Sequence, residues 1–188
     1  EDYSRALKCL TDAIYYEAAN EPDAGQRAVA QVIINRMRHP TYPNSICGVI
    51  YQGSERQTGC QFSYSCDGSM ARIPARAAWL RGQRVAMQAL SGYVFTPVGM
   101  ATHYHATYVY PYWAPSLNFI GTIGAHRFYS WKGSAGRPSA FFARHNGEPF
   151  PGPKPRAWSP RATPVLDPIQ LQKQYEREYA AARLKAEA

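Results

Sequence analysis

Apolar residues recur at helical spacing between residues 7 and 37, and this periodicity is the feature that most restricts the fold. Leu7, Leu10 and Ile14 follow one another at intervals of three and four residues, which places them on one face of an α-helix. Pro22 interrupts the pattern and Pro40 ends it. Between these prolines a second apolar stripe is formed by Val29, Val32, Ile33 and Met37. The N-terminal part is therefore predicted to form two consecutive amphipathic helices.

The following segments add one more helix and two short strands. Residues 41–69 are rich in turn residues, aromatics and cysteines, and we expect a loop region there with little regular structure. Pro74 opens a third helical pattern that ends at Gly92. Residues 101–106 (ATHYHA) alternate as in a strand, and residues 124–131 (GAHRFYSW) are the expected partner across a long irregular loop. These elements predict an α+β fold dominated by helices, with a small β-sheet.

Composition divides the 188 residues into one domain and a tail. Apolar residues make up 45% of the chain, which excludes a disordered protein and suffices for one core, assigned to residues 1–145. Seven prolines lie between Pro149 and Pro168, so residues 146–168 are predicted to form an extended linker. Residues 169–188 are rich in Gln, Lys, Glu and Ala and predict an exposed helical tail, with packing on a protein partner as the alternative. We expect a monomer.

The net charge of +8 favours a polyanionic partner such as nucleic acid, anionic lipid or an acidic bacterial wall. No nucleic-acid-binding signature occurs, and no run of 18 apolar residues could span a membrane. The sequence opens at Glu1 without Met, as expected of a mature chain whose signal peptide has been removed. Four arginines spaced along the third helix are expected to form a solvated face, with contact to acidic wall peptides as the alternative: Arg72, Arg76, Arg81 and Arg84.

Carboxylates are absent from the middle of the chain. No Asp or Glu lies between Asp67 and Glu148, whereas eight Lys or Arg residues do. Acid–base chemistry by carboxylates within the predicted domain must therefore use the acids up to residue 67. These are Glu1, Asp2, Asp12, Glu17, Glu21, Asp23, Glu55 and Asp67.

Glu17 is unusual among these acids because it lies on an apolar stripe. It follows Leu10 and Ile14 by seven and three residues, so its side chain is expected on the buried face of the first helix. A carboxyl group there either pairs with a cation, such as Arg27 or Arg36, or keeps its proton. A protonated carboxyl beside aromatic rings is what a glycosidase general acid requires.

Several segments, taken in order, carry a family resemblance. They are AIYYEAANEPDAGQRAVAQVIINRMRHPTYP (residues 13–43), SICGVIYQ, CQFSYSCDG, ATHYHA, YPYWAPSL and IGTIGAHRFY. Together they resemble the SleB-type, spore-cortex-lytic family of cell wall hydrolases over most of residues 7–131. The resemblance implies a single lysozyme-like catalytic domain that cleaves the glycan strands of peptidoglycan without a cofactor or metal. It also implies one catalytic glutamate at Glu17, and cleavage between N-acetylmuramic acid and N-acetylglucosamine that leaves a 1,6-anhydro ring.

Other residues are predicted to bind the substrate, although ordinary packing would explain each of them equally well. In the cysteine-rich loop these are Gln61, Phe62 and Ser63, which could bond N-acetyl groups or stack on a sugar. On the two strands they are His103, Tyr104, His105, His126 and Tyr129. Asp67 is the second acid that an inverting or retaining hydrolase would need, but its position before Gly68 favours a turn.

The four cysteines allow three disulfide pairings and lack zinc-binding spacing. An even number in a small domain favours an oxidising compartment over four buried thiols. The cysteine pattern resembles a Gram-negative branch of the family, which implies a periplasmic or secreted protein.

Three rival functions remain open from the sequence. A zinc amidase or peptidase acting on stem peptides would use His103, His105 and His126. A cysteine peptidase would pair Cys60 with His103. A basic module could bind the wall without cleaving it.

Overall fold

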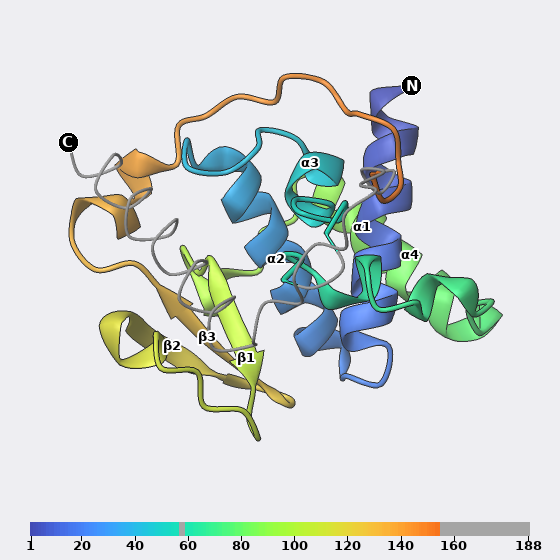
Figure 1. Cartoon of the computed structure of the whole chain (residues 1–188). Coiled ribbons are helices and arrows are strands. Elements are labelled where there is room, and N and C mark those ends of the chain that lie inside the picture. The colour runs from blue at the N-terminus through green and yellow to red at the C-terminus, as the bar shows by residue number, and fades with distance from the viewer. Residues whose placement is uncertain (57–58, 155–188) are drawn as a thin grey trace, which may run out of the picture.

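A computed structural model describes residues 1–56 and 59–154. Helices make up one side of the molecule and a small sheet the other (Figure 1). The long helices are α1 (Asp2–Ala18), α2 (Asp23–Arg38) and α4 (Arg76–Leu90), and α3 (Ile46–Ile50) is a short one. Single 3-10 turns are η1 (Ser63–Ser65), η2 (Ser69–Ala71), η3 (Thr96–Val98), η4 (Ala114–Ser116), η5 (Ser134–Gly136) and η6 (Pro138–Ala140). The predicted helix-dominated α+β fold is confirmed.

The sheet contains β1 (His103–Ala106), β2 (Asn118–Ile123) and β3 (His126–Ser130) in the order β1-β3-β2, with both pairs antiparallel. The expected pairing of the segments 101–106 and 124–131 is confirmed, because His103 lies opposite Tyr129. Strand β2 was not anticipated and falls in the segment predicted as an irregular loop. A register shift next to Gly121 and the absence of any fully buried residue in β2 remove the alternation that would have revealed it.

The core lies where α1 crosses the other helices. Leu10 and Ile14 are fully buried, as their spacing predicted. Gly82 allows α4 to approach α1 closely, since a Cβ atom there would lie 3.3 Å from Cγ2 of Ile14. Because this packing fixes the rotation of α1, it also fixes the direction in which Glu17 points. None of the helices described is long and apolar enough to cross a membrane.

Two disulfides brace the helical side. Cys9–Cys47 joins α1 to α3, and Cys60–Cys66 closes the loop that contains η1. They represent one of the three pairings that the sequence allowed, and they are typical of proteins from oxidising compartments. Since both Cys60 and Cys66 are bonded, Cys60 is not available as the nucleophile of a cysteine peptidase.

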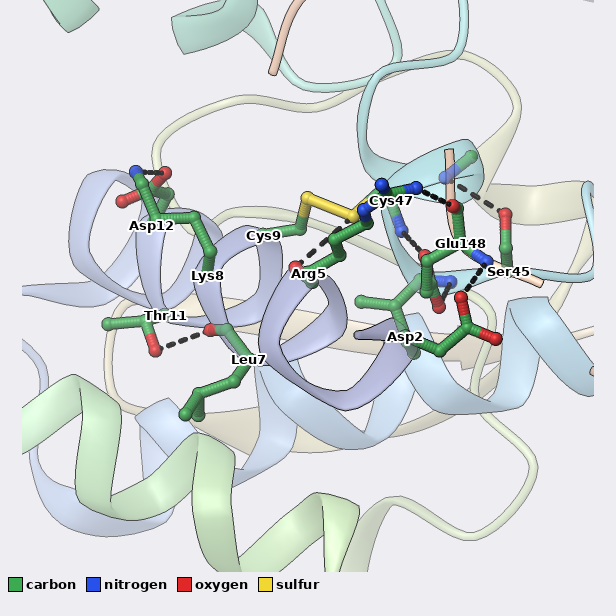
Figure 2. Close-up of a disulfide and its surroundings, with 12 residues drawn as sticks. Asp2, Arg5, Leu7, Lys8, Cys9, Thr11, Asp12, Ser45, Cys47 and Glu148 are labelled. Atoms are coloured by element: carbon green, nitrogen blue, oxygen red, sulfur yellow. Dashed lines mark hydrogen bonds and ion pairs between the residues drawn. A yellow bond between two sulfur atoms is a disulfide. The ribbon is translucent and has the colours of Figure 1, made fainter. Parts of the chain in front are cut away.

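Residues 141–154, which we call the C-terminal strap, run back over the helices to the start of α1 (Figure 1). Glu148 holds the strap in place (Figure 2): its carboxylate accepts hydrogen bonds from the backbone N–H groups of Ile46 and Cys47 at 2.8 and 2.9 Å. Further along, the Lys154 N–H donates to Ser54 Oγ at 2.8 Å. The first residues after position 145 therefore lie against the domain. The rest of the predicted linker and the tail, residues 155–188, lie outside the described residues.

Candidate active site

A cleft of about 480 Å³ opens between the C-terminal end of α1, the loop closed by Cys60–Cys66, and β1. Its walls combine aromatic rings with a few charged and polar groups. The residues that line it are Tyr16, Glu17, Arg36, Cys60, Gln61, Phe62, Ser63, Tyr64, Asp67, Ser69, His103, Tyr104, His105, Ala106, Tyr108, Trp113 and His126. Seven of the eight predicted substrate-binding residues are among them, and Tyr129 is the exception.

Glu17 occupies the last turn of α1 and is half-buried in this wall. Its Oε2 accepts a hydrogen bond from the Tyr104 hydroxyl at 2.9 Å. Burial raises the pKa of Glu17, and the nearby charge of Asp67 raises it further, whereas the Tyr104 hydrogen bond and the positive charge of Arg36 lower it. Burial is the largest of these effects, so the pKa of Glu17 is raised, which is the direction that a proton donor requires.

Neither ion pair that the sequence left open for Glu17 is formed. Arg27 pairs instead with Asp23 on the surface. Arg36 is buried and donates from Nε to the Thr102 carbonyl at 2.7 Å. Its Nη1 is buried without a hydrogen-bond partner among the described residues, on a side chain that lines the cleft. The sequence suggests Arg36 only as a possible counter-ion of Glu17. In the structure, Arg36 is part of the cleft wall.

The loop closed by Cys60–Cys66 forms another wall of the cleft. Phe62 is buried, and the Arg36 guanidinium carbon lies 5.5 Å from its ring centre. Gln61 is half-buried and Ser63 is exposed at the rim. Asp67 is exposed, and its Oδ1 accepts the Ser69 N–H at 2.8 Å, the geometry of a turn. The loop therefore brings a second carboxylate to the cleft, but one oxygen of this carboxylate is already bonded within the turn.

Histidines on the strands are held by neighbours behind the cleft surface. His103 Nδ1 lies 2.7 Å from the Thr102 hydroxyl, and its pKa is far below the ordinary value because the ring is buried near Arg36. His105 Nε2 lies 2.8 Å from the Tyr129 hydroxyl, which places Tyr129 behind the histidine. Both histidines line the cleft, and each has one ring nitrogen close to a neighbouring hydroxyl group.

His126 lies close to a second acid, Glu21. Nδ1 of His126 is 3.3 Å from Oε1 of Glu21, and burial lowers the pKa of His126 although the Glu21 charge acts in the opposite direction. The same Glu21 oxygen accepts the Ala125 N–H at 2.9 Å. Glu21 thus ties the start of α2 to the β2–β3 turn.

The histidines do not form a metal site. Across residues 1–56 and 59–154, no group of three or more His, Cys, Asp or Glu side chains is arranged to hold a metal ion. His105 and His126 face Tyr129 and Glu21 respectively, so the ligand set of the zinc alternative is not assembled. What the cleft does offer is a carboxyl with a raised pKa, a buried guanidinium and aromatic walls. This combination suits an uncharged polar ligand that needs a proton on an oxygen.

The model of a protein family described as Cell Wall Hydrolase matches residues 20–129, more than half of the chain. The chain belongs to this family. The matched residues include Arg36, the cysteine-closed loop, β1, β2 and all of β3 except Ser130. Glu17 lies three residues before the match begins, so its assignment rests on its position in the cleft.

Curated relatives of this cell wall hydrolase are spore cortex-lytic enzymes. The protein from Halalkalibacterium halodurans is 34% identical over 123 residues, which are 65% of this chain and 34% of the relative. The one from Bacillus subtilis is 48% identical over 46 residues, or 24% of this chain and 15% of the relative. The chain thus spans about a third, or less, of the length of these relatives.

Two solved structures share the fold. The catalytic domain of the Bacillus cereus SleB protein superposes with a TM-score of 0.55 at 27% identity, covering 68% of this chain and 91% of that domain. The catalytic domain of a germination-specific lytic transglycosylase, SleB from Bacillus anthracis, gives 0.54 at 28% identity, covering 67% and 94%. The expected SleB-type fold is therefore confirmed, and the match covers nearly the whole of each catalytic domain.

Proposed function

We propose that this cell wall hydrolase cleaves the glycan strands of peptidoglycan between N-acetylmuramic acid and N-acetylglucosamine, with Glu17 as its single acid–base residue. One observation carries the proposal: a carboxyl with a raised pKa lies in the wall of an aromatic-lined cleft and is held by one neutral hydroxyl. The family membership and the SleB relatives support the same substrate.

The chemistry follows from a single available acid. Glu17 donates its proton to the glycosidic oxygen as the bond to muramic acid C1 breaks, and the positive charge develops on the sugar ring. The carboxylate left behind then removes the proton from the muramic acid 6-hydroxyl, whose oxygen bonds to C1. The Glu17 proton is thereby restored and no water is consumed. The products are a free N-acetylglucosamine 4-hydroxyl and a 1,6-anhydro ring.

The ring nearest the reaction needs polar contacts to hold it. The unpartnered Nη1 of Arg36 can donate to an acetamido or hydroxyl oxygen of the substrate. Gln61 and Ser63 on one wall and His103 and His105 on the other are the proposed further contacts, with Phe62, Tyr104 and His126 completing the surface. Tyr129 acts from behind by holding His105.

A hydrolase is the second candidate, because Asp67 lies in the same cleft. Asp67 would then activate a water molecule or attack C1, as the second carboxylate of a glycosidase does. Its hydrogen bond to Ser69 in a turn is the reason that we rank this reaction second.

Mass spectrometry of the soluble products from purified peptidoglycan separates these reactions. Fragments that end in 1,6-anhydromuramic acid, one water lighter than hydrolysed fragments, are expected. Reducing muramic acid ends would instead assign a hydrolase and make Asp67 the next residue to substitute. Release of peptides without glycan cleavage would contradict both and favour an amidase.

The non-catalytic alternative is tested with Glu17→Gln. A wall-binding module would bind sacculi without lysing them, before and after the substitution. The two disulfides and this substrate also lead us to propose a periplasmic or secreted location.

A further inference from the structure

A second cavity of about 400 Å³ lies beside the cleft, and Tyr16 lines both. Its floor is α1 and its far wall is the start of α4, with Lys8, Asp12, Arg76 and Trp79 among the lining residues. None of the proposed catalytic chemistry uses these groups. A polar hollow that adjoins the active cleft is a position where a branch of the substrate could lie.

The charge of this cavity favours carboxylates. Asp12 is buried, and both of its oxygens are occupied, by the Lys8 ammonium and by the Trp79 indole N–H at 3.2 Å. Arg76 is exposed and has no ion pair within the part of the chain that the structure describes. The cavity therefore carries a net positive charge. The first turn of α4 has no acidic residue, so its positive dipole end adds to this charge.

The two cavities adjoin each other, because Tyr16 lines both of them. A short peptide branch of a substrate bound in the cleft can therefore enter the second cavity. In peptidoglycan, a stem peptide with several carboxylates branches from the lactyl group of muramic acid, the sugar at which the proposed cleavage occurs.

We propose that the second cavity binds the acidic stem peptide of the muramic acid next to the cleaved bond, with Arg76 and Lys8 contacting its carboxylates. Tyr16 and Trp79 form the aromatic surfaces against which the peptide backbone lies. This site rests on the proposed glycan-cleaving function and makes stem-bearing strands better substrates than bare ones. It also gives Arg76, one of the four arginines considered in the sequence analysis, a contact with acidic wall peptides.

Charge reversal at Arg76 tests the site with two substrates. Arg76→Glu is suitable because an acidic residue is favourable in the first turn of a helix, so folding is preserved. Arg84→Glu is the matched control, since Arg84 is exposed on the same helix and lies outside the cavity. Each variant is assayed on intact peptidoglycan and on glycan strands whose stems have been removed with an amidase.

We expect Arg76→Glu to reduce kcat/KM on stem-bearing strands about tenfold, through loss of charge-assisted bonds and added repulsion, and to leave bare strands within about twofold. Arg84→Glu should change neither. An equal loss on both substrates, or no loss on stem-bearing strands, would overturn the site.

A binding measurement keeps this test independent of activity. A free stem tetrapeptide is titrated into Glu17→Gln protein, and the indole N–H resonances are followed by NMR. We expect the Trp79 resonance to shift, and the shift to vanish when Arg76→Glu is added or when the peptide carboxylates are amidated. If the wild-type chain cleaves neither substrate but the shift occurs, the proposed function fails and the peptide site stands. Absence of the shift contradicts the site.

Discussion

Two glutamates lie at opposite ends of α1 and are held in opposite ways. At the end nearest the strap, Glu148 is fully enclosed and accepts two backbone N–H groups from α3, with His145 Nε2 2.8 Å away. At the other end, Glu17 accepts one hydroxyl from Tyr104 in the wall of the cleft. Three fixed partners satisfy the first carboxylate, whereas the second retains unused acceptor capacity.

The difference shows how one residue type serves structure and chemistry in the same domain. The backbone N–H groups that bond Glu148 belong to α3 and cannot move away from it, so that carboxylate fixes the strap. Burial with few donors destabilises the charged form of Glu17, so that carboxyl can release and regain a proton. The two glutamates thus differ in the number and kind of their hydrogen-bond donors, and this difference separates the structural role from the proposed catalytic one.

The largest expected effect comes from Glu17→Gln. Loss of the general acid should lower kcat on peptidoglycan about 10²–10⁴-fold, while the thermal unfolding temperature stays at or above that of the wild type. Release of soluble muropeptides and circular dichroism measure the two quantities. Glu21→Gln is a control at a neighbouring acid that bonds the β2–β3 turn. Retention of more than about a tenth of the activity in Glu17→Gln would remove Glu17 from its catalytic role.

Removal of the disulfide at the strap end should have the next largest effect. The double variant Cys9→Ser/Cys47→Ser opens a link between residues separated by 38 positions. Chain entropy then predicts a loss of about 4 kcal/mol in the free energy of unfolding, without a change in kcat of the folded fraction. Urea denaturation gives the free energy.

The double variant Cys60→Ser/Cys66→Ser should affect stability less and substrate binding more than Cys9→Ser/Cys47→Ser does. The Cys60–Cys66 link spans only six positions, so the expected loss is about 2 kcal/mol. It closes a wall of the cleft, however, and we expect a higher KM. A lower kcat for the Cys9/Cys47 variant, with an unchanged KM for the Cys60/Cys66 variant, would contradict this division.

Glu148→Gln should destabilise the protein by about 2–3 kcal/mol, because an amide nitrogen would face a backbone N–H where an oxygen now accepts it. The activity of the folded protein should not change. Arg144→Gln is the matched control, since Arg144 is exposed on the same strap. An Arg144→Gln variant as unstable as Glu148→Gln would mean that the strap is sensitive throughout rather than fixed at Glu148.

The smallest expected effect is a pH shift in Tyr104→Phe. The Tyr104 hydroxyl stabilises the charged form of Glu17, so its removal should raise the pKa of that carboxyl further. Because the general acid must be protonated, the alkaline limb of the kcat profile should move to higher pH. The profile is measured on soluble peptidoglycan fragments. A limb that moved to lower pH would show that Tyr104 does not act on the carboxylate.

The position of Glu17 could be predicted from sequence, since helical periodicity alone places it on the stripe of Leu10 and Ile14. The pairing of β1 with β3 could also be predicted, because residues 101–106 alternate and residues 124–131 offered a second candidate strand. Local patterns of this kind are set by backbone geometry within a few residues.

Contacts between segments far apart in the sequence could not be predicted in this way. Glu148 lies 102 positions from Ile46 and is followed by Pro149, Pro151 and Pro153, so its sequence environment is typical of a linker. The unpartnered Nη1 of Arg36 depends on the Thr102 carbonyl, which engages Nε instead. Neither arrangement leaves a periodic signal, and only the packed structure reveals them.

The course of the strap also has a mechanical consequence. It brings residue 148 beside Asp2, whose Oδ1 accepts the Glu148 N–H at 3.1 Å, so the strap is bonded to the start of α1 (Figure 2). Tension applied between Asp2 and the strap would peel this contact apart locally. The Cys9–Cys47 disulfide would then carry the force, and it lies in the half of α1 that is away from Glu17. Such tension would therefore leave the shape of the cleft unchanged.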